Sequence, residues 1–292
     1  MESILSQMLA RYPAHSQSEE KNALTEVVQE VALCGLARAG FFGKAAFYGG
    51  TALRIFYGLD RFSKDLDFSL VAPDADFRLE KYFSLLESEL SAVGLNFRAE
   101  EKVKSADSHI RSAFLKGGTK EHILSVYRDE KSAAKIASSE VIKIKLEVDV
   151  APPPFASFES KYRLLPSPYR VRLYDLPSLF AGKLHAVICR AWKSRVKGRD
   201  LYDYLFYLSR NAAVNMPHLK ARLVDSGYIA EDFDLTREAL ISMLNERFAA
   251  IDYEQARQDV LPFIGDKSKT DIWSAEFFIE ITKNLMSDGG DR

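Results

Sequence analysis

The chain has 292 residues, of which 47% are hydrophobic and 28% charged, and its formal net charge is −1. This apolar content supplies a substantial core and excludes a wholly disordered chain. The near-zero charge excludes a bulk polycation, so any nucleic-acid contact must come from a local basic patch. The length suits one large domain or two modest ones.

The sequence also limits the compartment. No apolar run reaches the roughly 18 residues that a membrane helix needs, and the N-terminus lacks the basic and apolar regions of a signal peptide. The cysteines, Cys34 and Cys189, form no CxxC pair and no zinc-site spacing. Two thiols in apolar surroundings suit a reducing environment. We therefore expect a cytoplasmic protein without a membrane partner.

The first half of the chain mixes helix and strand patterns. Residues 19–39 repeat apolar side chains near a 3.6-residue period, which predicts a helix, and residues 44–48 read as a short buried strand. Residues 65–70 alternate, which predicts a strand with Asp65 and Asp67 on one face. An amphipathic helix is expected over 74–95, and the cleanest alternating strand over 141–150.

Between the first two strands lies a glycine turn. Gly49 and Gly50 follow the strand directly, and Thr51 is a candidate N-cap for a short helix over 52–57. Gly58 would end that helix. The glycines allow a close approach of the backbone to a ligand, and N–H groups at a helix start suit an anion.

After about residue 165 the strand signal fades and helical patterns dominate. We predict an α+β fold with an N-terminal α/β domain over 1–165 and a helical domain over 166–292, joined near 165–170. The tail, 287–292, is expected to be disordered. The helices are expected over 178–192, 199–211, 216–227, 235–251 and 271–286.

The two aspartates need a partner. Like charges two residues apart on a strand disfavour double ionisation unless a cation lies between them. Mg²⁺ accepts one or two carboxylates and completes its shell with water and phosphate oxygens. Together with the glycine turn, Asp65 and Asp67 therefore favour a site for a nucleoside triphosphate and its metal, with Mn²⁺ as an alternative ion.

The strand at 141–150 offers further acids. Glu147 or Asp149 could supply a third carboxylate for two metals that clamp an in-line displacement. Lys143 or Lys145 would then contact phosphate or neutralise the acids. The alternative is an exposed sheet face with mixed charges, and a lone DxD or GGT is by itself common.

The segment "FYGGTALRIFYGLDRFSKDLDFSL" resembles the first motif of the AbiEii-type nucleotidyltransferases, the toxins of type IV toxin–antitoxin systems. The resemblance implies a polymerase-β-like nucleotidyltransferase domain with a mixed sheet, followed by a helical bundle. It implies Asp65 and Asp67 as Mg²⁺ ligands, with Glu147 closer to the family strand than Asp149. The nucleotide-binding residues that it implies are Gly49, Gly50, Thr51, Arg61, Ser63 and Lys183.

A later stretch, "AGKLHAVICRAWKSRVKGRDLYDYLFYL", resembles further family motifs through Lys183, Arg199, Asp200 and Asp203. The resemblance assigns Lys183 to the triphosphate and makes Lys183 and Asp203 part of the catalytic set with Asp65 and Asp67. Without it, Lys183 could be a lysine whose stem packs at a helix edge. Asp200 could simply favour the start of its helix.

Six basic residues crowd this stretch, and they suggest phosphate contacts to an RNA acceptor such as a tRNA end. They are Lys183, Arg190, Lys193, Arg195, Lys197 and Arg199.

The prediction is a Mg²⁺-dependent nucleotidyltransferase that moves a nucleotide from an NTP to an acceptor, expected to be RNA. The resemblance adds a toxin role and a cognate antitoxin. Two alternatives stay open. One is a nucleotide-binding regulatory protein without turnover, and the other is an enzyme that modifies a small molecule such as an antibiotic.

Overall fold

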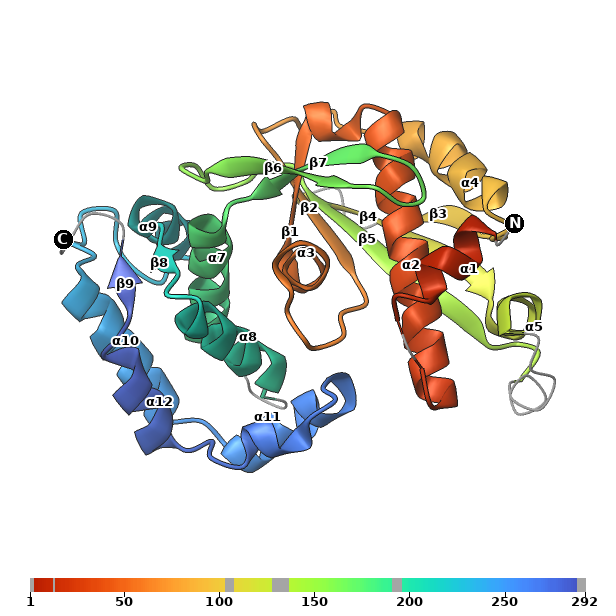
Figure 1. The fold of residues 1–292 in the computed structure, drawn as a ribbon. Coiled ribbons are helices and arrows are strands. Elements are labelled where there is room, and N and C mark those ends of the chain that lie inside the picture. The colour runs from red at the N-terminus through yellow and green to blue at the C-terminus, as the bar shows by residue number, and fades with distance from the viewer. Residues whose placement is uncertain (1–2, 13, 103–107, 128–136, 191–195, 288–292) are drawn as a thin grey trace. The chain divides into compact units, whose positions relative to one another are not determined.

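The computed structural model divides into two compact units, a sheet unit and a helical unit (Figure 1). The sheet unit comprises Met1–Ala52, Lys64–Pro152 and Ser160–Leu173. The helical unit comprises Leu53–Ser63, Pro153–Glu159 and Tyr174–Arg292. The structure describes residues 3–12, 14–102, 108–127, 137–190 and 196–287.

The sheet unit is built on a seven-stranded sheet in the order β3-β4-β5-β2-β1-β7-β6. Strand β2 is parallel to β5 and β1 is parallel to β7, whereas β1–β2, β3–β4 and β4–β5 are antiparallel. The predicted mixed sheet is therefore confirmed. The strands are β1 (Ala45–Tyr48), β2 (Leu66–Leu70), β3 (Arg98–Lys102), β4 (Ile110–Gly118), β5 (Val141–Asp149), β6 (Phe158–Arg163) and β7 (Tyr169–Tyr174).

Helices α2 and α4 lie side by side against this sheet (Figure 1). Helix α2 starts where the Ser16 hydroxyl accepts a hydrogen bond from the Glu19 N–H at 3.3 Å, which is an N-cap. The described helices of the unit are α1 (Ile4–Leu9), α2 (Gln17–Arg38), α3 (Gly49–Ala52), α4 (Phe83–Ala92) and α5 (Thr119–Tyr127), with 3₁₀ turns at Phe41–Gly43 and Leu79–Tyr82.

The core of this unit follows from strand alternation. Phe47 of β1 and Phe68 of β2 are register partners, and both are fully buried. Their ring centroids lie 5.1 Å apart, and Phe41 meets the Phe68 ring edge-on at 4.9 Å. The apolar face of each strand therefore faces the core, which leaves the Asp67 side of β2 for polar groups.

The helix expected over 74–95 begins later than predicted. The Asp74 carboxylate accepts a hydrogen bond from the Asp76 N–H at 3.1 Å, and its carbonyl accepts from the Phe77 N–H at 3.2 Å. Arg78 is extended, with φ −123°. This local aspartate turn competes with the helix, so the first helical turn is the 3₁₀ turn and α4 follows it.

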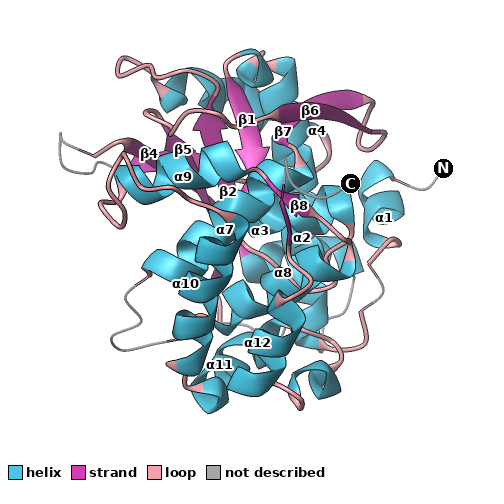
Figure 2. Ribbon diagram, turned by 90° about the vertical axis from the view of Figure 1, so that its left-hand side faces the viewer, coloured by secondary structure: helices cyan, strands magenta, loops and turns pink. Residues whose placement is uncertain are grey.

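The helical unit contains six described helices and a two-stranded parallel ladder, with the helices in cyan in Figure 2. The predicted helical second half is confirmed, although α11 lies in a polar stretch that gave no helix signal. The elements are α7 (Leu176–Cys189), α8 (Gly198–Ser209), α9 (Met216–Asp225), α10 (Arg237–Ala249), α11 (Tyr253–Val260), α12 (Ala275–Thr282), β8 (Ala213–Val214) and β9 (Met286–Ser287), with 3₁₀ turns at Leu261–Phe263 and Lys267–Thr270.

Aromatic side chains form the centre of this unit. The rings of Tyr204 and Phe248 lie 5.3 Å apart, and those of Phe248 and Phe278 lie 5.1 Å apart. All three residues are fully buried, so α8, α10 and α12 share one apolar core. Within the described residues, no helix combines the length and apolarity needed to cross a bilayer. Of the tail predicted to be disordered, residues 288–292 lie outside the described residues.

Candidate functional site

The sheet unit places two of the predicted acids next to each other. In the parallel pairing of β2 with β5, Asp67 is the register partner of Glu147. Register partners on neighbouring strands point to the same face of a sheet. Both residues are half-buried. The two side chains therefore project from the same polar face of adjacent strands. The sequence analysis expected a third acid on a neighbouring strand but gave no register between the strands.

The glycine turn lies next to the Asp67 carboxylate. Strand β1 ends at Tyr48, the register partner of Asp67, and Gly49 follows with a left-handed φ of +81°. A Cβ built on Gly49 would lie 2.7 Å from Asp67 Oδ2. Glycine is therefore required here twice, by the backbone conformation and by the nearness of the carboxylate.

Thr51 differs from the expectation. The helical segment starts at Gly49, so Thr51 lies inside it and the predicted N-cap role is wrong. Its side chain is fully buried and its hydroxyl donates to the Asp65 carbonyl at 2.5 Å. Thr51 thus fixes the backbone just before β2 to the glycine turn. The segment continues as a π-helical turn over Leu53–Tyr57, and Gly58 follows with φ +79°.

The two candidates for a third acid lie in different environments. Glu147 is 2.6 Å from Lys145 Nζ and accepts a hydrogen bond from the Ser112 hydroxyl at 3.1 Å. Asp149 is the register partner of Ser69 and accepts the Ala151 N–H at 3.0 Å, which closes the turn after β5. Of the two, Glu147 is the acid level with Asp67.

The carboxylates fit a hard divalent cation as a pair. Among the described residues there is no group of three or more His, Cys, Asp or Glu side chains that could hold a metal ion. Mg²⁺ needs only one or two carboxylates when phosphate oxygens and water complete its shell. Asp67 and Glu147 supply that donor chemistry, and the missing side chain of Gly49 lets the Asp67 carboxylate lie against the turn. Asp65 is exposed and directly precedes β2.

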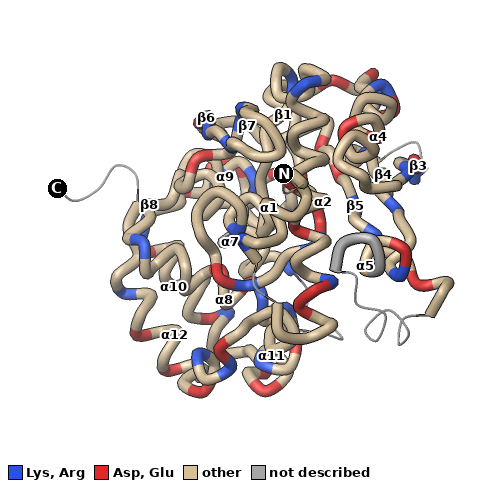
Figure 3. The backbone as a smooth tube through the Cα atoms, turned by 45° about the vertical axis from the view of Figure 1, so that its right-hand side comes forward, with Lys and Arg blue, Asp and Glu red and all other residues tan. Residues whose placement is uncertain are grey.

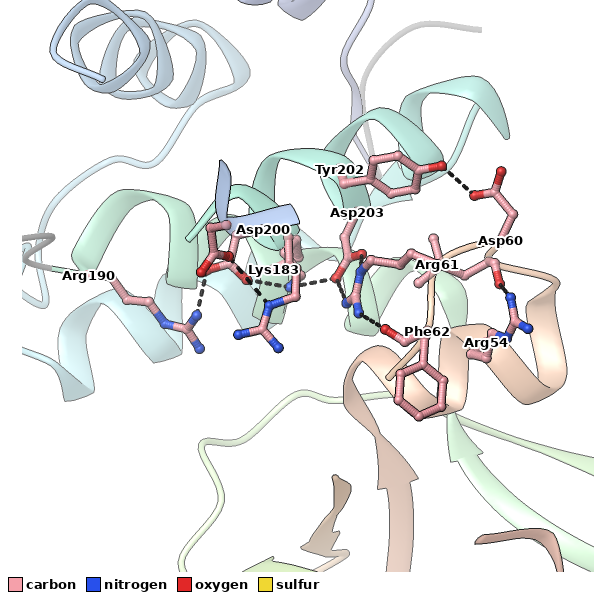
Figure 4. A network of polar contacts seen from close by, with 12 residues as sticks. Arg54, Asp60, Arg61, Phe62, Lys183, Arg190, Asp200, Tyr202 and Asp203 are labelled. Atoms are coloured by element: carbon pink, nitrogen blue, oxygen red, sulfur yellow. Dashed lines mark hydrogen bonds and ion pairs between the residues drawn. The ribbon is translucent and has the colours of Figure 1, made fainter. Parts of the chain in front are cut away.

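The helical unit holds the other predicted residues in an ion-pair network (Figure 4). Arg61 donates through Nε and Nη2 to both carboxylate oxygens of Asp203, at 2.6 and 2.7 Å. Lys183 Nζ lies 2.8 Å from Asp203 and 2.7 Å from Asp200. Arg190 pairs with the second oxygen of Asp200 at 2.5 Å. We call these five residues the helical cluster.

Burial and charge act against each other in this cluster. Burial alone would raise the pKa of Asp203, but the charges of Arg61 and Lys183 outweigh it and hold that pKa below its usual value. The cluster contains three cationic and two anionic side chains. Its formal excess of one positive charge makes it compatible with a further anion.

The segment 53–63 belongs to the helical unit, although it follows the glycine turn in sequence. The Tyr202 hydroxyl donates to Asp60 at 2.7 Å, and the Phe62 N–H donates to the Phe263 carbonyl at 2.7 Å. Arg61 is 4% exposed. These contacts anchor the segment to the helical unit. No local pattern in the sequence predicts them, because they join residues far apart in the chain. Ser63 ends the segment and is half-buried.

Of the four described residues in the basic stretch predicted to contact RNA, three form ion pairs within the protein. Lys183 and Arg190 belong to the helical cluster. The Arg199 guanidinium lies over the Phe263 ring at 4.4 Å, with Nε 3.5 Å from Asp259. Lys193 and Arg195 lie outside the described residues, and Lys197 directly precedes α8. Basic and acidic positions are interspersed over the helices in Figure 3.

Two carboxylates on adjacent strands beside a glycine turn are compatible with a divalent cation that carries a phosphorylated ligand. A family model described as "Nucleotidyl transferase AbiEii toxin, Type IV TA system" matches residues 31–280. The chain therefore belongs to this family of nucleotidyltransferase toxins, and the resemblance seen in the sequence is confirmed.

Two solved structures are similar to the chain. MenT4, a nucleotidyltransferase toxin from Mycobacterium tuberculosis, is 17% identical, with 95% of this chain and 98% of that chain covered and a TM-score of 0.47. JHP933 from Helicobacter pylori is 20% identical, with 90% and 91% covered and a TM-score of 0.46. No curated protein matches the chain.

Proposed function

We propose that the protein transfers a nucleotide from an NTP to a hydroxyl of an RNA acceptor, a tRNA end, with Mg²⁺ as its cofactor and Mn²⁺ as an alternative ion. The observation that supports this most directly is that Asp67 and Glu147 project from the same face of adjacent strands, with Asp67 next to Gly49. A triphosphate brings its own oxygen ligands to such a pair, so two protein carboxylates suffice.

The chain's own residues would bind and orient. Asp65, Asp67 and Glu147 would hold the metal, and the backbone of Gly49, Gly50 and Thr51 would approach the triphosphate. When bound, Mg²⁺ would neutralise charge on the phosphates and orient the leaving group. Positioning and electrostatics are the main protein contributions in phosphoryl-transfer chemistry.

Glu147 is proposed ahead of Asp149 as the third ligand. Glu147 is level with Asp67, whereas the Asp149 carboxylate accepts a backbone N–H that closes a turn. A ligand role for Glu147 requires that its contact with Lys145 loosens or is shared. Lys145 would then remain near the phosphate charge, as the sequence suggested.

Lys183 and Asp203 are proposed to act within the same reaction. Lys183 is 14% exposed and carries a charge that two aspartates already balance. It could bind phosphate by exchanging one of these partners. Asp203 is fully buried, which suits a residue that orients Lys183 better than one that takes a proton from the acceptor.

The test is incubation of the purified protein with each labelled NTP, total tRNA and Mg²⁺, followed by gel separation and mass spectrometry of the RNA. Label should appear on RNA for the wild type and for Asp149→Asn, and should be lost in Asp67→Asn. Glu147→Gln should lose most of it. Equal labelling by Asp67→Asn and wild type would refute the proposal, and label that forms only without RNA would indicate a small-molecule acceptor.

A type IV toxin implies a cognate antitoxin. We expect growth arrest on expression of the wild type and none with Asp67→Asn. Arrest by Asp67→Asn would favour the alternative of a nucleotide-binding protein that acts without turnover.

A further inference from the structure

We propose that a basic pocket at the start of β1 and β7 binds a backbone phosphate of the RNA acceptor. The proposal rests on the proposed function, because it names where that acceptor is held. The pocket has a cavity volume of about 390 Å³ and lies within the sheet unit. Its walls are Ala37, Arg38, Gly40, Phe42, Gly43, Ser160, Pro168, Tyr169, Arg170 and Arg172.

The charge of the pocket is one-sided. Three arginines line it, and none of its described lining residues is acidic. Arg38 is paired with Glu89 at 2.5 Å and donates to the Ser167 hydroxyl at 2.7 Å. Arg172 donates to the Gly43 carbonyl at 3.3 Å. Lys and Arg positions recur along β6 and β7 (Figure 3).

Arg170 is the residue best placed to receive a ligand. It is exposed, and no hydrogen bond or ion pair joins its guanidinium to any described residue. A guanidinium presents a planar fork of donors that matches phosphate. Gly40 and Gly43 add open backbone, since a Cβ on either would meet nothing within 4 Å.

The position of the pocket favours a polynucleotide over the NTP. Leu173 is the register partner of Phe47, so Arg170 is level with the residue before β1, and Asp67 is level with Tyr48. Four residues at about 3.3 Å and two strand spacings of about 4.8 Å separate the two points by roughly 16 Å. A single triphosphate at Asp67 leaves this pocket empty, whereas RNA carries further phosphates.

Strand alternation supports the same conclusion. Arg170 and Arg172 share one face of β7, opposite to Leu173. Because Leu173 pairs with the core residue Phe47, the two arginines point to the side of the sheet that carries Asp67 and Glu147. An RNA strand that extends along this face to Asp67 and Glu147 would pass Arg170 and Arg172.

The test compares two charge reversals of equal size in the same unit, Arg170→Glu and Lys81→Glu. Lys81 is exposed and lies in the 3₁₀ turn before α4. Binding of fluorescent total tRNA is measured by anisotropy over a salt series. One phosphate contact contributes a slope of about −0.7 to −0.9 in log K against log salt, or about five- to eightfold in affinity between 1 M and 0.1 M salt.

We expect Arg170→Glu to weaken tRNA binding by at least that factor and to lower the salt slope by about one, and Lys81→Glu to leave both unchanged. Arg170→Lys should retain most of the binding. Unchanged melting temperatures show that both reversals fold.

The proposal is overturned if Arg170→Glu and Lys81→Glu weaken tRNA binding equally. It is also overturned if Arg170→Glu weakens NTP binding as much as it weakens tRNA binding. If wild type and Arg170→Glu label RNA equally and bind it equally, only this inference fails. If the wild type labels no RNA, the proposed function fails instead.

Discussion

The buried pair of Arg61 and Asp203 gives a strong stability prediction. Their side chains are 4% and 0% exposed and share two hydrogen bonds. Removing one partner of a buried pair costs about 3–5 kcal/mol, because the other charge is left buried. Lys183 stays 2.8 Å from Asp203 and compensates part of that charge. We therefore expect Arg61→Ala to lose about 3 kcal/mol.

For a domain of this size, 1 kcal/mol shifts the melting temperature by about 2–4 °C, so Arg61→Ala should melt about 6–12 °C lower. Scanning calorimetry and urea unfolding at pH 7 measure the loss. The control is Lys283→Ala in the same unit, whose ion pair with Glu280 has side chains 63% and 71% exposed. Such surface pairs contribute about 0–1 kcal/mol. Equal effects of the two variants would refute the reasoning.

Three further variants test other features. Gly49→Ala should destabilise the protein by about 1–2 kcal/mol because of its positive φ, and should also abolish nucleotide transfer because the new Cβ displaces Asp67. Gly94→Ala, at φ +84° with open space around it, should lose similar stability but keep transfer. Urea unfolding measures the stability, and RNA labelling measures the transfer. Gly198→Ala should be severely destabilised, because its Cβ would lie 1.8 Å from a carbonyl oxygen of α11, and thermal melting would show it. Burial and a neighbouring arginine lower the pKa of His218 to about 4, so the folded state disfavours its protonation. The free energy of unfolding should therefore fall as the pH drops from about 6.5 toward 4. The urea midpoints at pH 7 and pH 5 should differ less in His218→Gln than in the wild type.

The sequence predicted those parts of the sheet whose pattern is local. Strands β1, β2 and β5 appear within one residue of their expected bounds. Strands β2 and β5 alternate apolar and polar side chains, and β1 is a short apolar run next to a glycine turn. Strands β3, β4, β6 and β7 were missed. For the edge strands β3 and β6, the burial patterns lack a fully buried face, so there is little apolar periodicity to detect.

The site could be predicted residue by residue but not as a geometry. The acids at 65–67 and 147–149 lie about 80 positions apart, and only the parallel pairing of β2 with β5 makes Asp67 and Glu147 neighbours. Register of this kind depends on long-range packing of buried faces. The Gly49 contact with Asp67 is likewise tertiary, although the glycine pair itself marked the turn.

The role of Arg61 also could not be predicted from the sequence alone, and it gives a final prediction. The family motif makes Arg61 a nucleotide ligand, whereas the structure pairs its guanidinium with Asp203 in the helical unit. These two roles have different kinetic consequences. If Arg61 anchors the segment 53–63, Arg61→Ala should lower stability and leave the KM for NTP unchanged at temperatures where the variant is folded. If Arg61 binds the triphosphate, the KM should rise at least tenfold, since a charge-assisted hydrogen bond contributes about 1.5–3 kcal/mol.

Steady-state pyrophosphate release at 15 °C, with folding checked by circular dichroism, separates the two roles. We expect the anchor, because both carboxylate oxygens of Asp203 already accept from Arg61 and the Phe62 carbonyl accepts a further N–H at 3.0 Å. Three donors of this guanidinium are thus engaged inside the helical unit, and contact with a phosphate would require breaking a pair that is almost fully buried. A tenfold rise in KM with an unchanged melting temperature would show that the anchor assignment is wrong.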